Sequence, residues 1–179
     1  MEGKINKEIG NSAIFLLGFM ASGKTSYGRK AAKSLNLPFI DLDATIEDTS
    51  GMSIAELFEK RGEKTFREIE MKTLERLLPF QGIMSLGGGT VSNKAVWPLL
   101  KDNGRTVFLD MPFDQCLGRL RTSKKSRPLA SNLKNIEAIN ELRALYEARQ
   151  DIYNLADYKL HFPYDHKLLA SQIDEWLND

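Results

Sequence analysis

The stretch Gly18-Phe19-Met20-Ala21-Ser22-Gly23-Lys24-Thr25 decides the fold of this 179-residue chain. It fits the pattern G-x-x-x-x-G-K-[ST], in which glycines let the backbone approach a phosphate and successive N–H groups form an anion nest. An apolar run at residues 13–17 precedes it and predicts a buried strand. Residues 24–35 predict a helix whose N-terminus adds further free N–H groups. This context predicts a phosphate-binding loop at residues 18–25 rather than an incidental glycine-rich turn.

The loop assigns two chemical roles directly. Lys24 is expected to reach the β- and γ-phosphates of a nucleotide, and the hydroxyl of Thr25 is expected to bind Mg²⁺. The residues that we expect to bind ATP here are Gly18, Ala21, Ser22, Gly23, Lys24, Thr25 and Ser26.

The composition is that of an ordinary globular protein, with 42% hydrophobic and 27% charged residues. A net charge of +1 provides no field that would attract nucleic acid or an acidic membrane, so we expect neither as a partner. The single cysteine, Cys116, cannot form an internal disulfide, and residues 1–12 lack the apolar segment of a signal peptide. We expect a single domain over residues 1–179, located in the cytoplasm.

Strand and helix patterns alternate along the chain, which predicts an α/β fold with a parallel sheet. Further strands are expected at 38–42, 82–86, 106–109 and 158–162. A capping box at residues 53–56 opens a short helix that stops at Gly62, and a long helix follows over 63–78. Residues 122–135 are polar and basic without apolar periodicity, so we expect a lid there.

Polar residues cluster where the strands end, which is where ligands bind in parallel sheets. Asp41 and Asp43 close the second strand and, two residues apart, would point the same way. One would lie near Mg²⁺ and the other near a substrate hydroxyl; the alternative is a helix N-cap plus a solvated acid. Arg67 and Glu70 share a helix face, either as a site pair or as a solvated surface pair.

The chain resembles the shikimate kinase family. The resemblance rests on the phosphate loop, Asp41-Leu42-Asp43, Phe66-Arg67-x-x-Glu70, the triple glycine at 87–89, Arg127-Pro-Leu and Arg149-x-x-x-Tyr153, in that order. It implies a P-loop fold like that of nucleoside-monophosphate kinases, with a five-stranded parallel sheet in the order 2-3-1-4-5, helices on both faces and a lid. It also implies transfer of the γ-phosphate of ATP to the 3-hydroxyl of shikimate, in aromatic amino-acid biosynthesis, by a monomer.

The resemblance further implies roles for individual residues. Asp43 would hold the ring hydroxyls and act in catalysis with Lys24 and Arg127, within an acceptor-binding region at about residues 41–78. Arg67 and Arg149 would grip the carboxylate, and Gly87, Gly88 and Gly89 would line the ring. Arg127 on the lid would reach ATP and substrate, Arg121 would stack on adenine, and Asp41 would hold Mg²⁺ through water.

Two departures and two rival functions remain at this level. Ala21 stands where many members have glycine, and Asp151 stands where the family usually has proline. One rival is a P-loop kinase for another hydroxy acid or a nucleoside monophosphate, although Asp43 disfavours the nucleotide because it would face an anionic phosphate. The other rival is a non-catalytic nucleotide-binding module, which has no need for Asp43, Arg67, Gly88 and Arg149 around one space.

Overall fold

Five parallel strands form the centre of the molecule. The computed structural model describes residues 13–123, 133 and 135–177. The strands are β1 (Ala13–Leu17), β2 (Phe39–Asp41), β3 (Ile83–Ser85), β4 (Gly104–Asp110) and β5 (Tyr158–His161). Their order is β2-β3-β1-β4-β5 and every neighbouring pair is parallel, which confirms the predicted topology.

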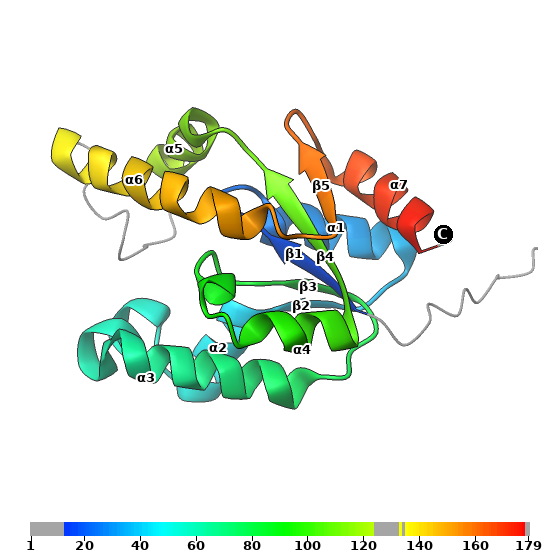
Figure 1. Cartoon of the computed structure of the whole chain (residues 1–179), viewed down its shortest axis with the longest axis horizontal. Coiled ribbons are helices and arrows are strands. Elements are labelled where there is room, and N and C mark those ends of the chain that lie inside the picture. The colour runs from blue at the N-terminus through cyan, green and yellow to red at the C-terminus, as the bar shows by residue number, and fades with distance from the viewer. Residues whose placement is uncertain (1–12, 124–132, 134, 178–179) are drawn as a thin grey trace, which may run out of the picture.

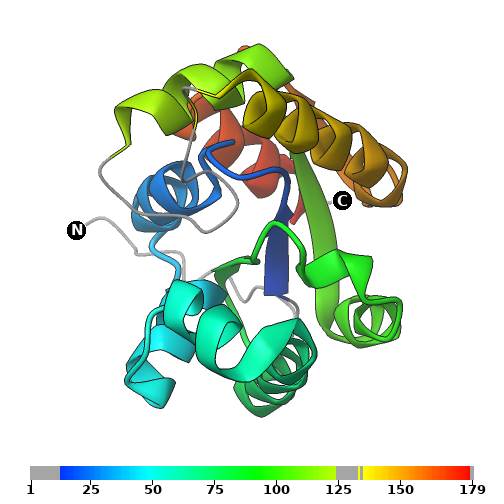
Figure 2. The ribbon, with the colours of Figure 1, turned by 90° about the vertical axis from the view of Figure 1, so that its left-hand side faces the viewer.

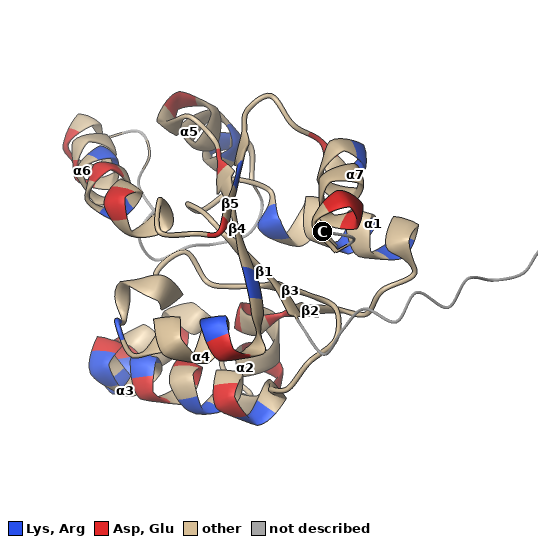
Figure 3. Ribbon diagram, turned by 45° about the vertical axis from the view of Figure 1, so that its right-hand side comes forward, with Lys and Arg blue, Asp and Glu red and all other residues tan. Residues whose placement is uncertain are grey.

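Helices cover both faces of this sheet (Figure 1). They are α1 (Lys24–Leu35), α2 (Leu42–Ser50), α3 (Ile54–Leu77), α4 (Val96–Asn103), α5 (Phe113–Thr122), α6 (Ile136–Tyr153) and α7 (His166–Trp176), with a 3₁₀ turn η1 (Thr90–Ser92). Helix α1 packs against α7, and α4 packs against β4. The pair α1 and α7 lies on the opposite side of the sheet from α4 (Figure 3). Figure 3 also shows basic and acidic residues interspersed along α3.

The central strand delivers the phosphate loop to the middle of the sheet. All five residues of β1 are buried, as expected for a parallel strand covered on both faces. β1 lies between β3 and β4, with Leu16 opposite Ser85 and Leu17 opposite Phe108. The loop that follows Leu17 therefore emerges at the carboxyl edge of the sheet, between the loops that follow β3 and β4.

The predicted boundary of the second strand was wrong at its end. We expected the strand to reach Leu42, but β2 stops at Asp41 and α2 begins at Leu42. The reason is local: Asp41 Oδ1 accepts the backbone N–H of Ala44 at 3.1 Å and so caps the helix. Asp43 therefore lies in the first helical turn, not on the strand beside Asp41.

Helix α3 consists of two helical segments that meet at Gly62. Gly62 has φ 78° and ψ 163°, which interrupts the helical backbone. This confirms the short helix that stops at Gly62 and the long one that follows it. The capping box at Ser53 and Glu56 is also confirmed, with both of its hydrogen bonds present.

Helices α5 and α6 lie on one side of β1, and α2 and α3 lie on the other (Figure 2). The helix predicted at 136–156 is α6, which ends at Tyr153. The predicted lid at 122–135 falls mostly outside the described residues, and Arg127 lies outside them.

Candidate functional site

The phosphate loop joins β1 to α1 in a left-handed turn. Ala21 has φ 62° and Gly23, the residue before α1, has φ 100°. The loop thus accepts the Cβ of Ala21 in a conformation that costs an L-residue about 1–2 kcal/mol. Lys24 is buried, and its Nζ donates to the carbonyl oxygens of Gly18 at 2.8 Å and Phe19 at 2.9 Å. These contacts hold the ammonium group against the loop.

A hydroxyl and a carboxylate meet at the start of α1. Thr25 Oγ1 donates to Asp41 Oδ2 at 2.5 Å, while the other oxygen of Asp41 caps α2. Oxygen atoms of this kind are the ligands that hard divalent cations prefer. Asp41 is thus the N-cap of α2, and its other oxygen contacts Thr25; the role of both side chains at Mg²⁺ stays a prediction. No cluster of three or more His, Cys, Asp or Glu side chains arranged to hold a metal occurs among the residues that the structure describes.

Three oxygen-bearing side chains approach Gly87 after β3. A Cβ on Gly87 would lie 2.7 Å from Asp43 Oδ1, 2.9 Å from Thr90 Oγ1 and 3.2 Å from Glu70 Oε1. Glu70 is 2% exposed, and its Oε1 accepts from Thr90 Oγ1 at 2.6 Å. Asp43 thus lies beside Gly87, and it comes from the first turn of α2 and not from the end of β2.

Two guanidinium groups from separate helices converge on Gly89. A Cβ there would lie 2.5 Å from Arg67 Nη2 and 3.0 Å from Arg149 Nη2. Arg67 is held by Glu70, because its Nη1 donates to Glu70 Oε2 at 2.7 Å. The other arm, Nη2, lies nearest Gly89 and also donates to Glu63 Oε1 at 3.4 Å. Two adjacent guanidinium groups form a site for a carboxylate or phosphate.

All of the side chains described above except Thr90 line one cavity of about 520 Å³. The predicted site residues on its wall are Ala21, Gly23, Lys24, Thr25, Ser26, Asp41, Asp43, Arg67, Gly87, Gly88, Gly89 and Arg149. Gly18 and Ser22 are buried and do not line it, and Ser22 Oγ has no hydrogen-bond partner among the described residues. The wall of the cavity thus combines residues of the phosphate loop with both arginines.

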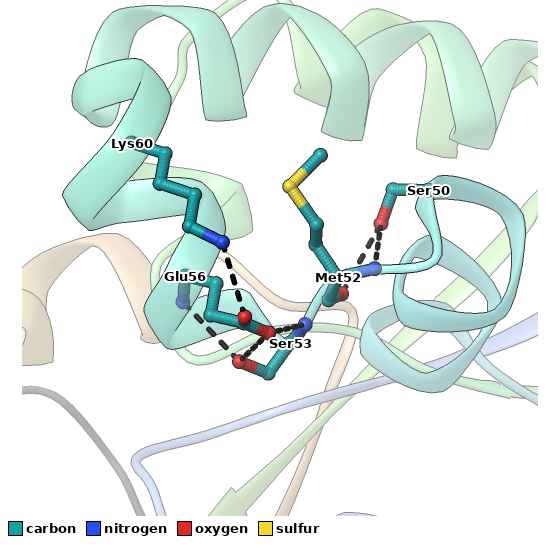
Figure 4. A network of polar contacts seen from close by, with 5 residues as sticks. All are labelled: Ser50, Met52, Ser53, Glu56 and Lys60. Atoms are coloured by element: carbon teal, nitrogen blue, oxygen red, sulfur yellow. Dashed lines mark hydrogen bonds and ion pairs between the residues drawn. The ribbon is translucent and has the colours of Figure 1, made fainter.

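An apolar wall completes the cavity near the arginines. Ile54, Ala55 and Phe58 come from the first segment of α3, and Phe66 from the second, with the Phe58 and Phe66 rings 4.6 Å apart. The capping box fixes the start of this wall (Figure 4): Ser53 Oγ accepts from Glu56 N at 3.2 Å, and Glu56 Oε2 accepts from Ser53 N at 2.9 Å. The Ser53 N–H lowers the pKa of Glu56, and the Ser53 hydroxyl and Lys60 add to this effect.

The model of the family described as shikimate kinase matches residues 20–176 of this chain. The chain belongs to the shikimate kinase family. Among curated relatives, the shikimate kinase of Aquifex aeolicus (strain VF5) is 39% identical over 148 residues, covering 82% of this chain and 84% of the relative. The shikimate kinase of Bacteroides thetaiotaomicron is 37% identical over 146 residues, covering 81% of this chain and 83% of the relative.

Solved structures of shikimate kinases have the same fold. The crystal structure of the enzyme from Bacteroides thetaiotaomicron matches with a TM-score of 0.85 and 32% identity, covering 94% of this chain and 99% of that one. The enzyme from Acinetobacter baumannii in complex with shikimate matches with a TM-score of 0.82 and 32% identity, covering 93% and 92%. A gluconokinase from Sinorhizobium meliloti, with a TM-score of 0.58 and 14% identity, shares the fold alone.

In this shikimate kinase family member, Arg119 lies beside the phosphate loop, although no sequence pattern singled it out; the stacking of Arg121 on adenine stays a prediction. Arg119 lines the cavity, and its guanidinium donates to the Ala21 carbonyl at 3.3 Å and the Tyr27 hydroxyl at 2.7 Å. Arg121 is exposed and does not line the cavity. Two residues on a helix point about 200° apart, so α5 can direct only one of the two toward the loop.

Tyr164 and Thr90 were also missed by sequence reasoning. The Tyr164 hydroxyl donates to the Ser22 carbonyl at 2.9 Å, so the segment after β5 supports the phosphate loop. Burial raises the pKa of Tyr164, which keeps this phenol protonated.

Within the described part of the chain, no helix has the length and apolar character needed to cross a bilayer.

Proposed function

We propose that this protein transfers the γ-phosphate of ATP to the 3-hydroxyl of shikimate, giving shikimate 3-phosphate and ADP, in aromatic amino-acid biosynthesis. The observation that carries the proposal is the convergence of Arg67 and Arg149 on Gly89, in the same cavity as Lys24. A small acceptor with a carboxylate at one end and hydroxyls at the other fits between those two points.

Binding of the acceptor follows from the groups on the wall. The two guanidinium groups take the carboxylate, and the apolar side chains Ile54, Phe58 and Phe66 cover a face of the ring. Asp43 accepts a hydrogen bond from a ring hydroxyl and orients it toward the phosphate loop. A site built to hydrogen-bond this hydroxyl should reject acceptors that lack it.

Phosphoryl transfer needs positioning and charge stabilisation more than covalent help from the protein. Lys24 neutralises charge on the transferred group, and the N–H groups at the start of α1 hold the phosphates. Thr25 and Asp41 would hold Mg²⁺, Asp41 through water, since their paired oxygens suit it. When bound, Mg²⁺ neutralises charge on the β- and γ-phosphate oxygens.

The nucleotide base is proposed to lie against Arg119, whose guanidinium also covers the ring of Tyr27 at 5.3 Å from its centroid. Arg127 remains proposed as the lid arginine that reaches ATP and substrate. We further propose a cytoplasmic monomer that forms a single kinase domain.

The test is ADP release from MgATP with a panel of acceptors, with the product identified by mass spectrometry. Shikimate should be phosphorylated, whereas gluconate and nucleoside monophosphates should not. ADP release that shikimate does not stimulate would support a non-catalytic module, and faster turnover of another acceptor would refute shikimate as the substrate.

A further inference from the structure

Tyr153 is a buried tyrosine outside the cavity whose hydroxyl contacts the site. It is the last residue of α6 and is 0% exposed, but it does not line the cavity. Most of α6 is exposed or half-buried, and only Leu142 and Tyr153 are buried. The ring of Tyr153 lies 5.1 Å from that of Phe108, so the side chain anchors this end of the helix on β4.

The hydroxyl of Tyr153 is directed at the loop after β3. It donates to the carbonyl oxygen of Gly88. Arg149 precedes Tyr153 by four residues, which places both side chains on one face of α6. Burial raises the pKa of Tyr153 to about 12, although the charge of the nearby Arg149 guanidinium acts to lower it, so the phenol keeps its proton for Gly88.

Gly88 lies between the phosphate loop and Arg149. A Cβ on Gly88 would be 3.5 Å from Met20 N and 3.6 Å from Arg149 Nη1. A shift of the Gly88 carbonyl would therefore change both the space beside the phosphate loop and the support of the guanidinium. The group that prevents this shift is the phenol of Tyr153.

We infer that Tyr153 is a positioning residue for the acceptor: its hydroxyl fixes the Gly88 carbonyl and holds Arg149 where the acceptor carboxylate binds. The inference rests on the proposed function, because it takes shikimate as the acceptor. Tyr153 acts through Gly88 and Arg149 and does not itself touch the acceptor.

The test is Tyr153→Phe, which keeps the ring on Phe108 and removes only the hydroxyl. The KM for shikimate should rise about fivefold, as for one lost hydrogen bond. The KM for ATP and the midpoint of thermal unfolding should change little. The matched control is Tyr146→Phe, since Tyr146 lies on the same helix and donates to the Met111 carbonyl at 3.1 Å, away from Gly88. That control should leave the KM for shikimate unchanged.

A neutral acceptor separates positioning from general loosening of the site. The methyl ester of shikimate lacks the carboxylate charge, so wild type and Tyr153→Phe should use it with KM values within about twofold, the range expected when two groups do not interact. In an Arg149→Ala background, Tyr153→Phe should add no further loss for shikimate. This double-mutant cycle compares only ratios of KM values, so it remains informative if Tyr153→Phe lowers the stability of the protein.

The inference is wrong if Tyr153→Phe leaves the KM for shikimate at the wild-type value, or if the losses from Tyr153→Phe and Arg149→Ala simply add. It is also wrong if shikimate and its ester are affected equally. Wild-type protein that fails to phosphorylate shikimate would instead refute the proposed function, so the two failures are distinguishable.

Discussion

Replacing Arg67 by lysine tests whether the fork of its guanidinium matters. In the structure, Nη1 donates to Glu70 Oε2 at 2.7 Å, and Nη2 is directed at Gly89. A lysine ammonium is a point charge and cannot serve the buried carboxylate and an acceptor carboxylate with the same parallel geometry. Arg67→Lys keeps a cation beside Glu70. Arg67→Ala would leave Glu70, whose side chain is 3% exposed, without its ion-pair partner, so a loss of stability could not be separated from a loss of binding.

The size of the effect follows from the contact that is lost. A hydrogen bond to a charged group contributes about 1.5–3 kcal/mol, and each 1.4 kcal/mol changes an affinity about tenfold. The Arg67 side chain is 21% exposed, so water screens the contact and the lower end applies. We therefore expect the KM for shikimate to rise about tenfold, with little change in the KM for ATP.

The assay couples ADP release to NADH oxidation, with each substrate varied at saturation of the other. The control is Arg76→Lys, because Arg76 lies near the far end of the same helix and donates to Thr49 Oγ1 at 3.4 Å, outside the cavity. A KM for shikimate within about twofold of wild type in Arg67→Lys, no more than independent sites vary, would refute the fork as the basis of acceptor binding.

Of four further predictions, one concerns the phosphate loop, two concern a helix cap and one concerns the cysteine. Lys24→Ala should keep the fold but lower kcat by more than tenfold, since a preorganised donor contributes about 2.7–4 kcal/mol; a kcat above a tenth of wild type would contradict its role. Ser53→Ala should cost about 1 kcal/mol and lower Tm by about 2–4 °C, measured by circular dichroism. Because the pKa of Glu56 is lowered in the folded state, its stabilisation is present above its ordinary value of 4.5 and is lost as the pH falls below it. Glu56→Gln should therefore weaken the fall of the urea unfolding midpoint at acidic pH. A pH dependence equal to that of the wild type would contradict this. Burial raises the pKa of Cys116 to about 11, so a thiol reagent should label the folded protein far more slowly than the unfolded one; equal rates would show that the thiol is accessible.

The sequence predicted the phosphate loop and the sheet order because both depend on local patterns and on family motifs. It misplaced Asp43 because the carboxylate of Asp41 can end a strand or cap a helix, and the cap prevails here. The motif Arg67-x-x-Glu70 predicted a shared helix face, but not that Glu70 would be buried or bonded to Thr90, which follows β3 and is distant in sequence.

The two arginines of α5 show a different limit of prediction from sequence. The buried stripe of this helix consists of Phe113, Cys116, Leu117 and Leu120. Arg119 and Arg121 flank that stripe on opposite edges, as helical periodicity alone indicates. Which edge faces the phosphate loop depends on how α5 packs, and this is information that no pattern within the helix contains.

The break at Gly62 has a consequence for how acceptor selectivity can change. In an unbroken helix, inserting one residue rotates everything after it by about 100°, so wall and clamp would have to vary together. Here residues 54–61 contribute Ile54, Ala55 and Phe58 to the apolar wall, whereas Phe66, Arg67 and Glu70 follow the break. Nothing lies within 4 Å of a Cβ placed on Gly62, so the joint is not locked by packing. Substitutions in residues 54–61 can therefore reshape this part of the wall while Arg67 and Glu70 keep their positions.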